Sequence, residues 1–199
     1  MRIPILDLKP AYEELRAELD AAYHRVMASG RVLLGPELEA FETEYAQSVG
    51  VAHCIGVANG LEALQLALMA RGIGPGDEVI VPSHGYIATF LAVTHTGAKP
   101  IPCEPDPATY NLDPTRIASL LTPRTKAILP IHLYGQPADV EAISAIARPR
   151  GLFVLEGQHE RIYHYRLYER LITLDIDRDP DIYRIDHLGD PVRAGWLVG

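Results

Sequence analysis

Lysine is scarce in this chain: Lys9, Lys99 and Lys126 are the three lysines among 199 residues. No basic run occurs, and the formal net charge is −8 with a pI near 5.4. Binding to nucleic acid depends on clustered Lys and Arg, so this class of function is excluded. Eighteen consecutive apolar residues occur nowhere, and residues 1–8 lack the cationic and apolar segments of a secretion signal. We therefore expect a cytoplasmic protein without a nucleic-acid or membrane partner.

Cysteine and metal-ligand patterns are also sparse. Cys54 and Cys103 each lie in an apolar run, without a nearby Cys or His at metal-ligand spacing. The eight histidines are scattered, and no pair has the spacing of a zinc-binding helix. Aspartates at positions 175, 177, 179, 181 and 186 have the spacing of a calcium loop, but Pro180 stands where that loop needs glycine. We predict two buried thiols, no metal site and a solvated acidic turn.

The distribution of apolar residues predicts an α/β fold. The chain is 48% hydrophobic with a mean hydropathy of +0.03, as expected of a folded globular protein. Two amphipathic helices are expected from Pro10 to near Gly30 and from Pro36 to near Gly50. Short apolar runs then alternate with helical ones, which indicates a mostly parallel sheet with crossover helices. The expected strands are 53–57, 78–81, 99–103, 127–132 and 152–155, and the expected helices are 60–71, 87–96, 114–121 and 138–147.

Two strand-to-helix junctions are candidate ligand sites. At Asn59 and Gly60 an apolar strand runs through a glycine into a helix, whose N-terminal N–H groups would suit a phosphate. The alternative is a glycine that serves packing alone. Tyr86 follows the strand 78–81, where its ring could lie against a flat heteroaromatic ligand. The alternative is that Tyr86 packs over the sheet edge, and at both junctions the residues by themselves favour the packing alternative.

The order of several motifs resembles the DegT/DnrJ/EryC1/StrS family of pyridoxal-phosphate (PLP) dependent sugar aminotransferases. The resemblance is colinear across residues 1–156. The residues that carry it are Asp7-Leu8, Gly30, Leu34-Gly35-Pro36-Glu37, Phe41-Glu42, Asn59-Gly60-Leu61-Glu62-Ala63-Leu64, Gly72 to Pro82, Gly97-Ala98-Lys99-Pro100, Tyr110-Asn111-Leu112-Asp113-Pro114, Thr122 to Ile128, and His132-Leu133-Tyr134-Gly135-Gln136-Pro137.

This resemblance implies part of a fold-type-I large domain, three layers of helix, mostly parallel sheet and helix. Such enzymes move an amino group, usually from glutamate or glutamine, onto a nucleotide-linked keto sugar, and they are homodimers with active sites at the subunit interface. Carried over by position, the turn Asn59, Gly60, Leu61 and Glu62 would hold the PLP phosphate, and Tyr86 would stack on the pyridine ring. Leu61 supplies an amide but not the hydroxyl of the threonine found in many relatives. The Asn-Gly-Leu triplet favours keto-deoxy sugars as substrates.

The resemblance fails at Gly157. In the family the corresponding strand ends in Glu-Asp, and the aspartate pairs with the pyridine nitrogen. Here Glu156 is followed by Gly157, and Glu160 replaces the usual Gln or His. All three lysines precede the region of the Schiff-base lysine, and the segment that would hold it is absent, so the histidines at 159, 164 and 187 cannot be equated with it. We predict no catalytic residue in this chain.

The chain is therefore expected to have two parts, 1–156 as the N-terminal part of a large domain and 157–199 as a divergent tail. The tail contains strand candidates at 171–176 and 194–198. Family members are longer, and the abrupt loss of pattern suggests a frameshifted, rearranged or truncated gene product. A sheet interrupted here would have an unpaired edge unless the tail covers it.

Two functions are compatible with these observations. The first is a nucleotide-sugar aminotransferase whose chemistry is impaired or lost. The second is a non-catalytic binding or interaction module derived from that fold, for example one that pairs with a full-length paralogue. An unrelated nucleotide-binding domain is disfavoured, because the glycine-rich stretch 72–76 precedes a strand instead of following one.

Overall fold

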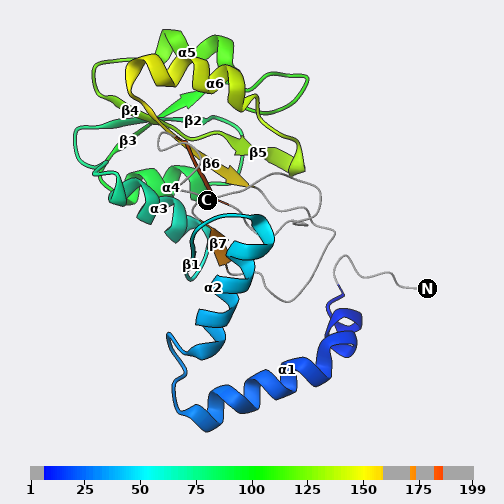
Figure 1. The fold of residues 1–199 in the computed structure, drawn as a ribbon. Helices are drawn as coiled ribbons and strands as arrows, with labels where there is room; N and C mark the ends of the chain where they lie inside the picture. Colours follow the sequence, from blue (N-terminus) through cyan, green and yellow to red (C-terminus); the bar gives the residue numbers. More distant parts are fainter. Residues whose placement is uncertain (1–6, 159–170, 174–181, 186–199) are drawn as a thin grey trace.

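A mostly parallel sheet forms the centre of the molecule. The computed structural model describes residues 7–158, 171–173 and 182–185 (Figure 1). The sheet strands are β2 (Glu78–Pro82), β3 (Lys99–Cys103), β4 (Thr125–Ile128), β5 (Ile131–His132), β6 (Phe153–Gln158) and β8 (Ile182–Ile185). All recorded pairings among them are parallel. The fold class predicted from the pattern of apolar runs is confirmed.

The predicted strand 127–132 is divided into two short strands, β4 and β5, that lie end to end along β6. Ala127 of β4 lies opposite Phe153, and Ile131 of β5 lies opposite Gly157, so both segments keep the same register against β6. The interruption falls at Leu129 and Pro130. Proline lacks an N–H group, so it cannot contribute a donor to the ladder at that point.

Four helices cover the two faces of the sheet (Figure 1). They are α3 (Gly60–Ala70), α4 (Ala88–His95), α5 (Pro114–Leu120) and α6 (Val140–Ala147); the 3₁₀ turns η1 (Leu133–Gly135) and η2 (Arg148–Arg150) flank α6. Successive strand residues point to opposite faces. Val79 and Val81 accordingly pack with α3 and α4, while Ile80 packs with α5 and α6. The predicted three-layer arrangement is thus present, with one hydrophobic core on each side of the sheet.

Side-chain caps fix where three of these helices begin. The Asn59 side chain accepts a hydrogen bond from the Glu62 N–H at the start of α3, and Asp113 accepts one from the Thr115 N–H at α5. Asp139 accepts one from the Ala142 N–H, so α6 begins at Val140, two residues later than predicted. Such caps satisfy donors that have no partner within the helix.

The first two helices extend away from the sheet (Figure 1). Helix α1 (Lys9–Ser29) buries none of its residues, although its sequence pattern is amphipathic. Helix α2 (Pro36–Val49) packs against β1 (Cys54–Gly56) through Tyr45 and Ala46, which form a small cluster with Cys54. Both predicted helices are confirmed, but the apolar stripe of α1 is at most half-buried.

Two short strands of the tail pair with the body. β8 pairs with β6 along residues 154–157, so the sheet edge that the sequence left open is covered there. β7 (Leu171–Thr173) pairs antiparallel with β1, which confirms the first part of the predicted strand 171–176. The predicted strand 194–198 and the five aspartates of the calcium-like spacing lie outside the described residues. β6 itself runs across residue 156, and the two-part division at that point stays a prediction.

Two further properties concern the described part of the chain. No helix within it is long and apolar enough to cross a membrane. Cys54 and Cys103 are both buried thiols, as predicted.

Candidate functional site

The carboxyl ends of the parallel strands bring the candidate residues to one edge of the sheet. Helix α3 runs antiparallel to β6: Leu64 in its first half lies beside Gly157 near the end of β6, whereas the Arg71 guanidinium after its last turn lies 4.9 Å from the ring centroid of Phe153 at the start of β6. The N-terminus of α3 therefore points to the carboxyl edge. Ligands of open α/β sheets bind outside this edge.

The start of α3 offers backbone donors at that edge. Asn59 has an extended backbone, and its side-chain oxygen takes the Glu62 N–H at 3.0 Å. The N–H groups of Gly60 and Leu61 belong to the first turn, where no intrahelical acceptor exists. Gly60 is buried and Leu61 is half-buried, whereas Asn59 and Glu62 are exposed. The arrangement suits an anion, although the Glu62 amide that the resemblance assigns to the phosphate is already engaged by the cap.

Tyr86 lies in the segment that joins β2 to α4. Tyr86 is 63% exposed. The Tyr86 carbonyl accepts a hydrogen bond from the Thr89 N–H at 3.2 Å, which ties the residue to the first turn of α4. The ring is thus anchored at the carboxyl edge with much of its surface available for stacking.

Gly157 faces the same side of the sheet as α3. A Cβ built on it would lie 2.5 Å from Ile131 Cδ1 and 3.5 Å from Leu64 Cδ2, so the Ile131 side chain fills the space that a side chain at 157 would take. The neighbouring Glu156 points to the opposite face, is 1% exposed, and lies 3.0 Å from His132 Nε2 through its Oε2. Glu156 therefore cannot replace a carboxylate at position 157.

The three lysines lie away from this edge. Lys99 is the first residue of β3 and Lys126 the second residue of β4, which places both at the amino ends of their strands. Lys9 begins α1, which extends away from the sheet (Figure 1). The amino and carboxyl ends of a strand are on opposite edges of a parallel sheet, so no lysine of this chain is near the start of α3.

His132, Glu156 and Asn111 form buried polar contacts near the carboxyl edge, and the sequence pattern did not reveal these contacts. The Ala138 N–H donates to His132 Nδ1 at 3.0 Å, so the ring proton is on Nε2, which donates to Glu156. Asn111, 3% exposed, accepts the Leu133 N–H through Oδ1 at 3.0 Å. Its Nδ2 donates to the carbonyls of residues 136 and 137, each at 2.9 Å. A histidine at the end of an apolar strand was the available signal for His132.

Comparison with known proteins gives the family. The model of the DegT/DnrJ/EryC1/StrS aminotransferase family matches residues 13–160, and the chain belongs to this family. It is 59% identical over 155 residues to dTDP-3-amino-3,4,6-trideoxy-alpha-D-glucose transaminase of Streptomyces venezuelae, covering 78% of this chain and 41% of that protein. It is 54% identical over 156 residues to the erythromycin biosynthesis sensory transduction protein EryC1 of Saccharopolyspora erythraea, with 78% and 43% covered. The chain thus spans about two-fifths of the length of these relatives.

Solved structures agree with the fold. The crystal structure of S. venezuelae DesV is similar with a TM-score of 0.75 at 59% identity, covering 78% of this chain and 42% of that one. NtdA from Bacillus subtilis, solved with bound cofactor PMP, has a TM-score of 0.73 at 34% identity, with 79% and 38% covered. Both are fold-type-I enzymes that depend on PLP, and the predicted partial large domain is confirmed.

The donor set fits some parts of PLP and not others. Gly60 and Leu61 amides suit its phosphate, and the exposed Tyr86 ring suits its pyridine ring. A lysine amine for covalent attachment is absent from this edge, and Gly157 leaves the pyridine nitrogen without a carboxylate from β6. Within the described residues, no group of three or more His, Cys, Asp or Glu could hold a metal ion. The described residues at this edge therefore offer backbone donors and an aromatic ring.

Proposed function

We propose that this chain carries the phosphate and ring contacts of a PLP-dependent aminotransferase site for a nucleotide-linked keto sugar, and that by itself it binds the cofactor without turnover. Family membership and the dTDP-sugar transaminase among its relatives support the substrate class. In such enzymes PLP carries the amino group and withdraws electrons from the reacting carbon. Glutamate or glutamine would be the amino donor, and the Asn59 to Leu61 sequence favours a keto-deoxy sugar.

In this proposal the backbone N–H groups of Gly60 and Leu61 bind the phosphate and Tyr86 orients the ring. Asn59 holds the first turn of α3 in shape through its bond to the Glu62 N–H. The observation that carries the loss of turnover is the position of the lysines, since Lys99 and Lys126 begin their strands at the opposite edge. Without an amine at the site, none of the residues that the structure describes is placed to anchor the cofactor covalently or to move the proton at the reacting carbon.

A PLP titration of the purified chain, followed by visible absorbance, borohydride reduction and intact mass, tests this proposal. We expect saturable binding without a stoichiometric covalent mass gain, and no amino transfer to a dTDP-linked keto sugar. Tyr86→Ala should weaken PLP binding, while Tyr86→Phe, which keeps the ring, should bind as the unchanged chain does.

Each other outcome has a defined meaning. A stoichiometric adduct on one lysine that disappears in Tyr86→Ala would show that a lysine does reach the site, and the non-covalent part of the proposal would be wrong. A partial adduct that persists in Tyr86→Ala would be surface labelling of a lysine such as the exposed Lys126. Absence of saturable binding would leave the fold as the property shared with the family and would reject a retained cofactor site.

We further propose that α1 and the segment after it pack against another copy of this chain or a full-length paralogue. Support comes from the exposure of Leu33 and Leu34, at 82% and 74%, beside a helix with no buried residue. The Arg31 guanidinium donates to the Leu34 carbonyl at 2.7 Å, which fixes this apolar segment in shape. Exposed apolar surface of this kind marks protein interfaces. Light scattering should show a dimer that Leu33→Glu converts to monomer; an unchanged mass in that variant would reject this interface.

A further inference from the structure

Two tyrosines at the carboxyl edge have a backbone conformation that bulky residues rarely adopt. Tyr110, in the connection from β3 to α5, has φ 62°, and Tyr134 in η1 has φ 56°. Both side chains are more than half exposed, at 54% and 63%, so burial of the rings does not compensate for the unfavourable backbone. Such outliers persist where the surroundings enforce them, and they cluster at ligand-binding sites.

One buried side chain enforces both conformations. Asn111 directly follows Tyr110, and its side-chain oxygen and nitrogen bond the backbone on either side of Tyr134, at Leu133 and at residues 136 and 137. The Tyr110 N–H also donates to the Asp106 carbonyl at 2.7 Å. The two loops are therefore held against each other, and each presents an exposed ring at the same edge.

The Tyr110 ring lies beside the connection that carries Tyr86. The centroid of the Tyr110 ring lies 6.2 Å from that of His84, at an interplanar angle of 51°. His84 precedes Tyr86 by two residues in the same connection. A ligand that extends from Tyr86 past His84 would thus reach Tyr110 next.

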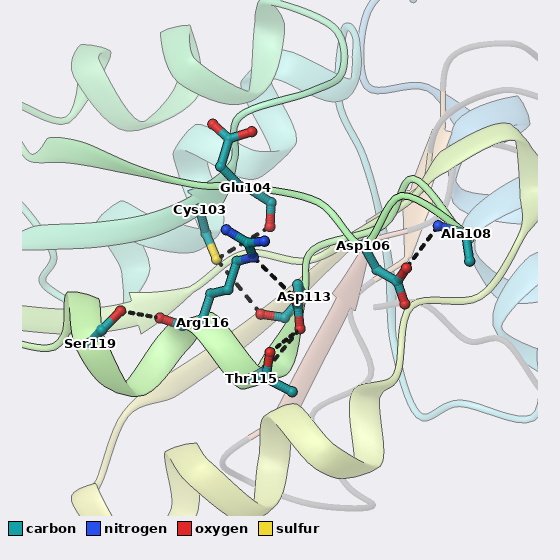
Figure 2. A network of polar contacts seen from close by, with 8 residues as sticks. All are labelled: Cys103, Glu104, Asp106, Ala108, Asp113, Thr115, Arg116 and Ser119. Atoms are coloured by element: carbon teal, nitrogen blue, oxygen red, sulfur yellow. Dashed lines mark hydrogen bonds and ion pairs between the residues drawn. The ribbon is translucent and has the colours of Figure 1, made fainter.

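The charges in the connection that carries Tyr110 restrict which part of a ligand would fit there. Figure 2 shows Glu104 and Asp106 in the same connection, with the Asp106 carboxylate accepting the Ala108 N–H at 2.8 Å. Asp113 at its end accepts from the Thr115 N–H and from Arg116 Nε, at 2.9 and 3.0 Å (Figure 2). Of these three carboxylates, Asp113 alone has an ion pair with a cation in the part of the chain that the structure describes, so a phosphate group is disfavoured in this connection and a neutral flat ring is favoured.

We propose that Tyr110, on the loop that Asn111 joins to the loop of Tyr134, stacks on the nucleobase of the nucleotide-linked sugar. This assignment rests on the proposed substrate class and adds a residue that determines its binding. The base is the part of such a substrate that is flat and carries no phosphate charge, and aromatic side chains stack on bases of every kind. His84, between Tyr86 and Tyr110, is positioned to donate a ring N–H to the diphosphate.

Isothermal titration calorimetry with dTDP, thymidine and inorganic pyrophosphate tests the assignment in the full chain. The informative variant is Tyr110→Asn, because Asn tolerates the left-handed backbone and so removes the ring without disturbing the loop. We expect Tyr110→Asn to weaken binding of dTDP and thymidine about fivefold or more, while Tyr110→Phe stays within about twofold of the unchanged chain. Pyrophosphate binding should be the same in all three proteins.

Equal dTDP affinity in Tyr110→Asn and the unchanged chain would overturn the assignment, as would absence of dTDP binding to the unchanged chain. If Tyr110→Asn weakens pyrophosphate binding as strongly as dTDP binding, the assignment is also overturned, because Tyr110 would then affect recognition of the phosphates and not of the base. The same proteins are titrated with PLP, whose binding should not respond to Tyr110→Asn. If PLP fails to bind while dTDP binding depends on Tyr110, the proposed cofactor site fails and this assignment stands.

Discussion

Gly157 gives the sharpest prediction about how this chain differs from its family. Replacing it by alanine places a methyl group 2.5 Å from Ile131 Cδ1, well inside van der Waals contact. Ile131 is 5% exposed within the core between the sheet and α3, so its ethyl group has little room to rotate. The next atoms, on Leu64 and Leu129, are at 3.5 and 3.7 Å, which is ordinary contact. One atom therefore carries the conflict.

The expected energies have opposite signs. Overpacking of a core by one methyl group costs about 1–3 kcal/mol. Replacing glycine by alanine in extended backbone stabilises by about 0.4–1 kcal/mol, because the unfolded chain loses freedom. We therefore expect Gly157→Ala to lower the free energy of unfolding by about 1 kcal/mol. In the Ile131→Val background, which lacks Cδ1, the same change should raise it by about 0.5 kcal/mol.

A double-mutant cycle measured by urea unfolding with circular dichroism checks this. Ile131→Val alone should cost about 0.5–1.5 kcal/mol. The coupling between the two positions should be about 1.5 kcal/mol, well above the scatter of independent sites. Additive effects, within about 0.5 kcal/mol, would refute the view that Ile131 occupies the space of a side chain at 157.

The remaining predictions concern two thiols and one carboxylate. Burial raises the pKa of Cys54 to about 12 and that of Cys103 to about 11, so at about pH 8 neither should react with iodoacetamide until the chain is unfolded; rapid native labelling would contradict their burial. The Thr122 hydroxyl donates to Glu78 Oε2 at 2.5 Å, and the Arg124 guanidinium donates to Glu78 Oε1 at 2.6 and 3.0 Å. These hydrogen bonds, first that of Thr122 and then those of Arg124, lower the pKa of Glu78. A carboxyl group whose pKa is lower in the folded state stabilises the protein at pH values above its unfolded-state pKa. This stabilisation is lost as the pH falls through the folded-state pKa. Thermal unfolding of Glu78→Gln should hence show a lower midpoint at neutral pH and a weaker decline below about pH 4.

Much of the fold was predictable because it depends on local patterns. The strand 99–103 has the predicted bounds, and the cap at Asp113 forms as its sequence context indicates. The boundary of α6 was missed because Asp139, and not the preceding alanine, supplies the cap. The interruption of the strand 127–132 was missed because a run of apolar residues conceals the effect of Pro130 on the ladder.

That α1 buries none of its residues was not predictable from periodicity. An amphipathic pattern indicates that one face is apolar, but it does not specify what covers that face. Pairing of β8 with β6 was not predictable from the sequence either. Val154 pairs with Ile182, 28 positions later in the chain, and the two segments share no motif. Pairing at such separation depends on which edge the rest of the fold leaves open.

The sequence by itself determined the family, the order of strands and helices, and the chemical types at the candidate site. It also determined that position 157 has no carboxylate. The tertiary structure alone decided that Glu156 faces away from α3, that both strand lysines lie at the opposite edge, and that Asn111 holds Tyr110 and Tyr134 together. Residue type and spacing are local properties, whereas the face and the edge on which a residue lies follow from how strands are ordered and paired in the sheet.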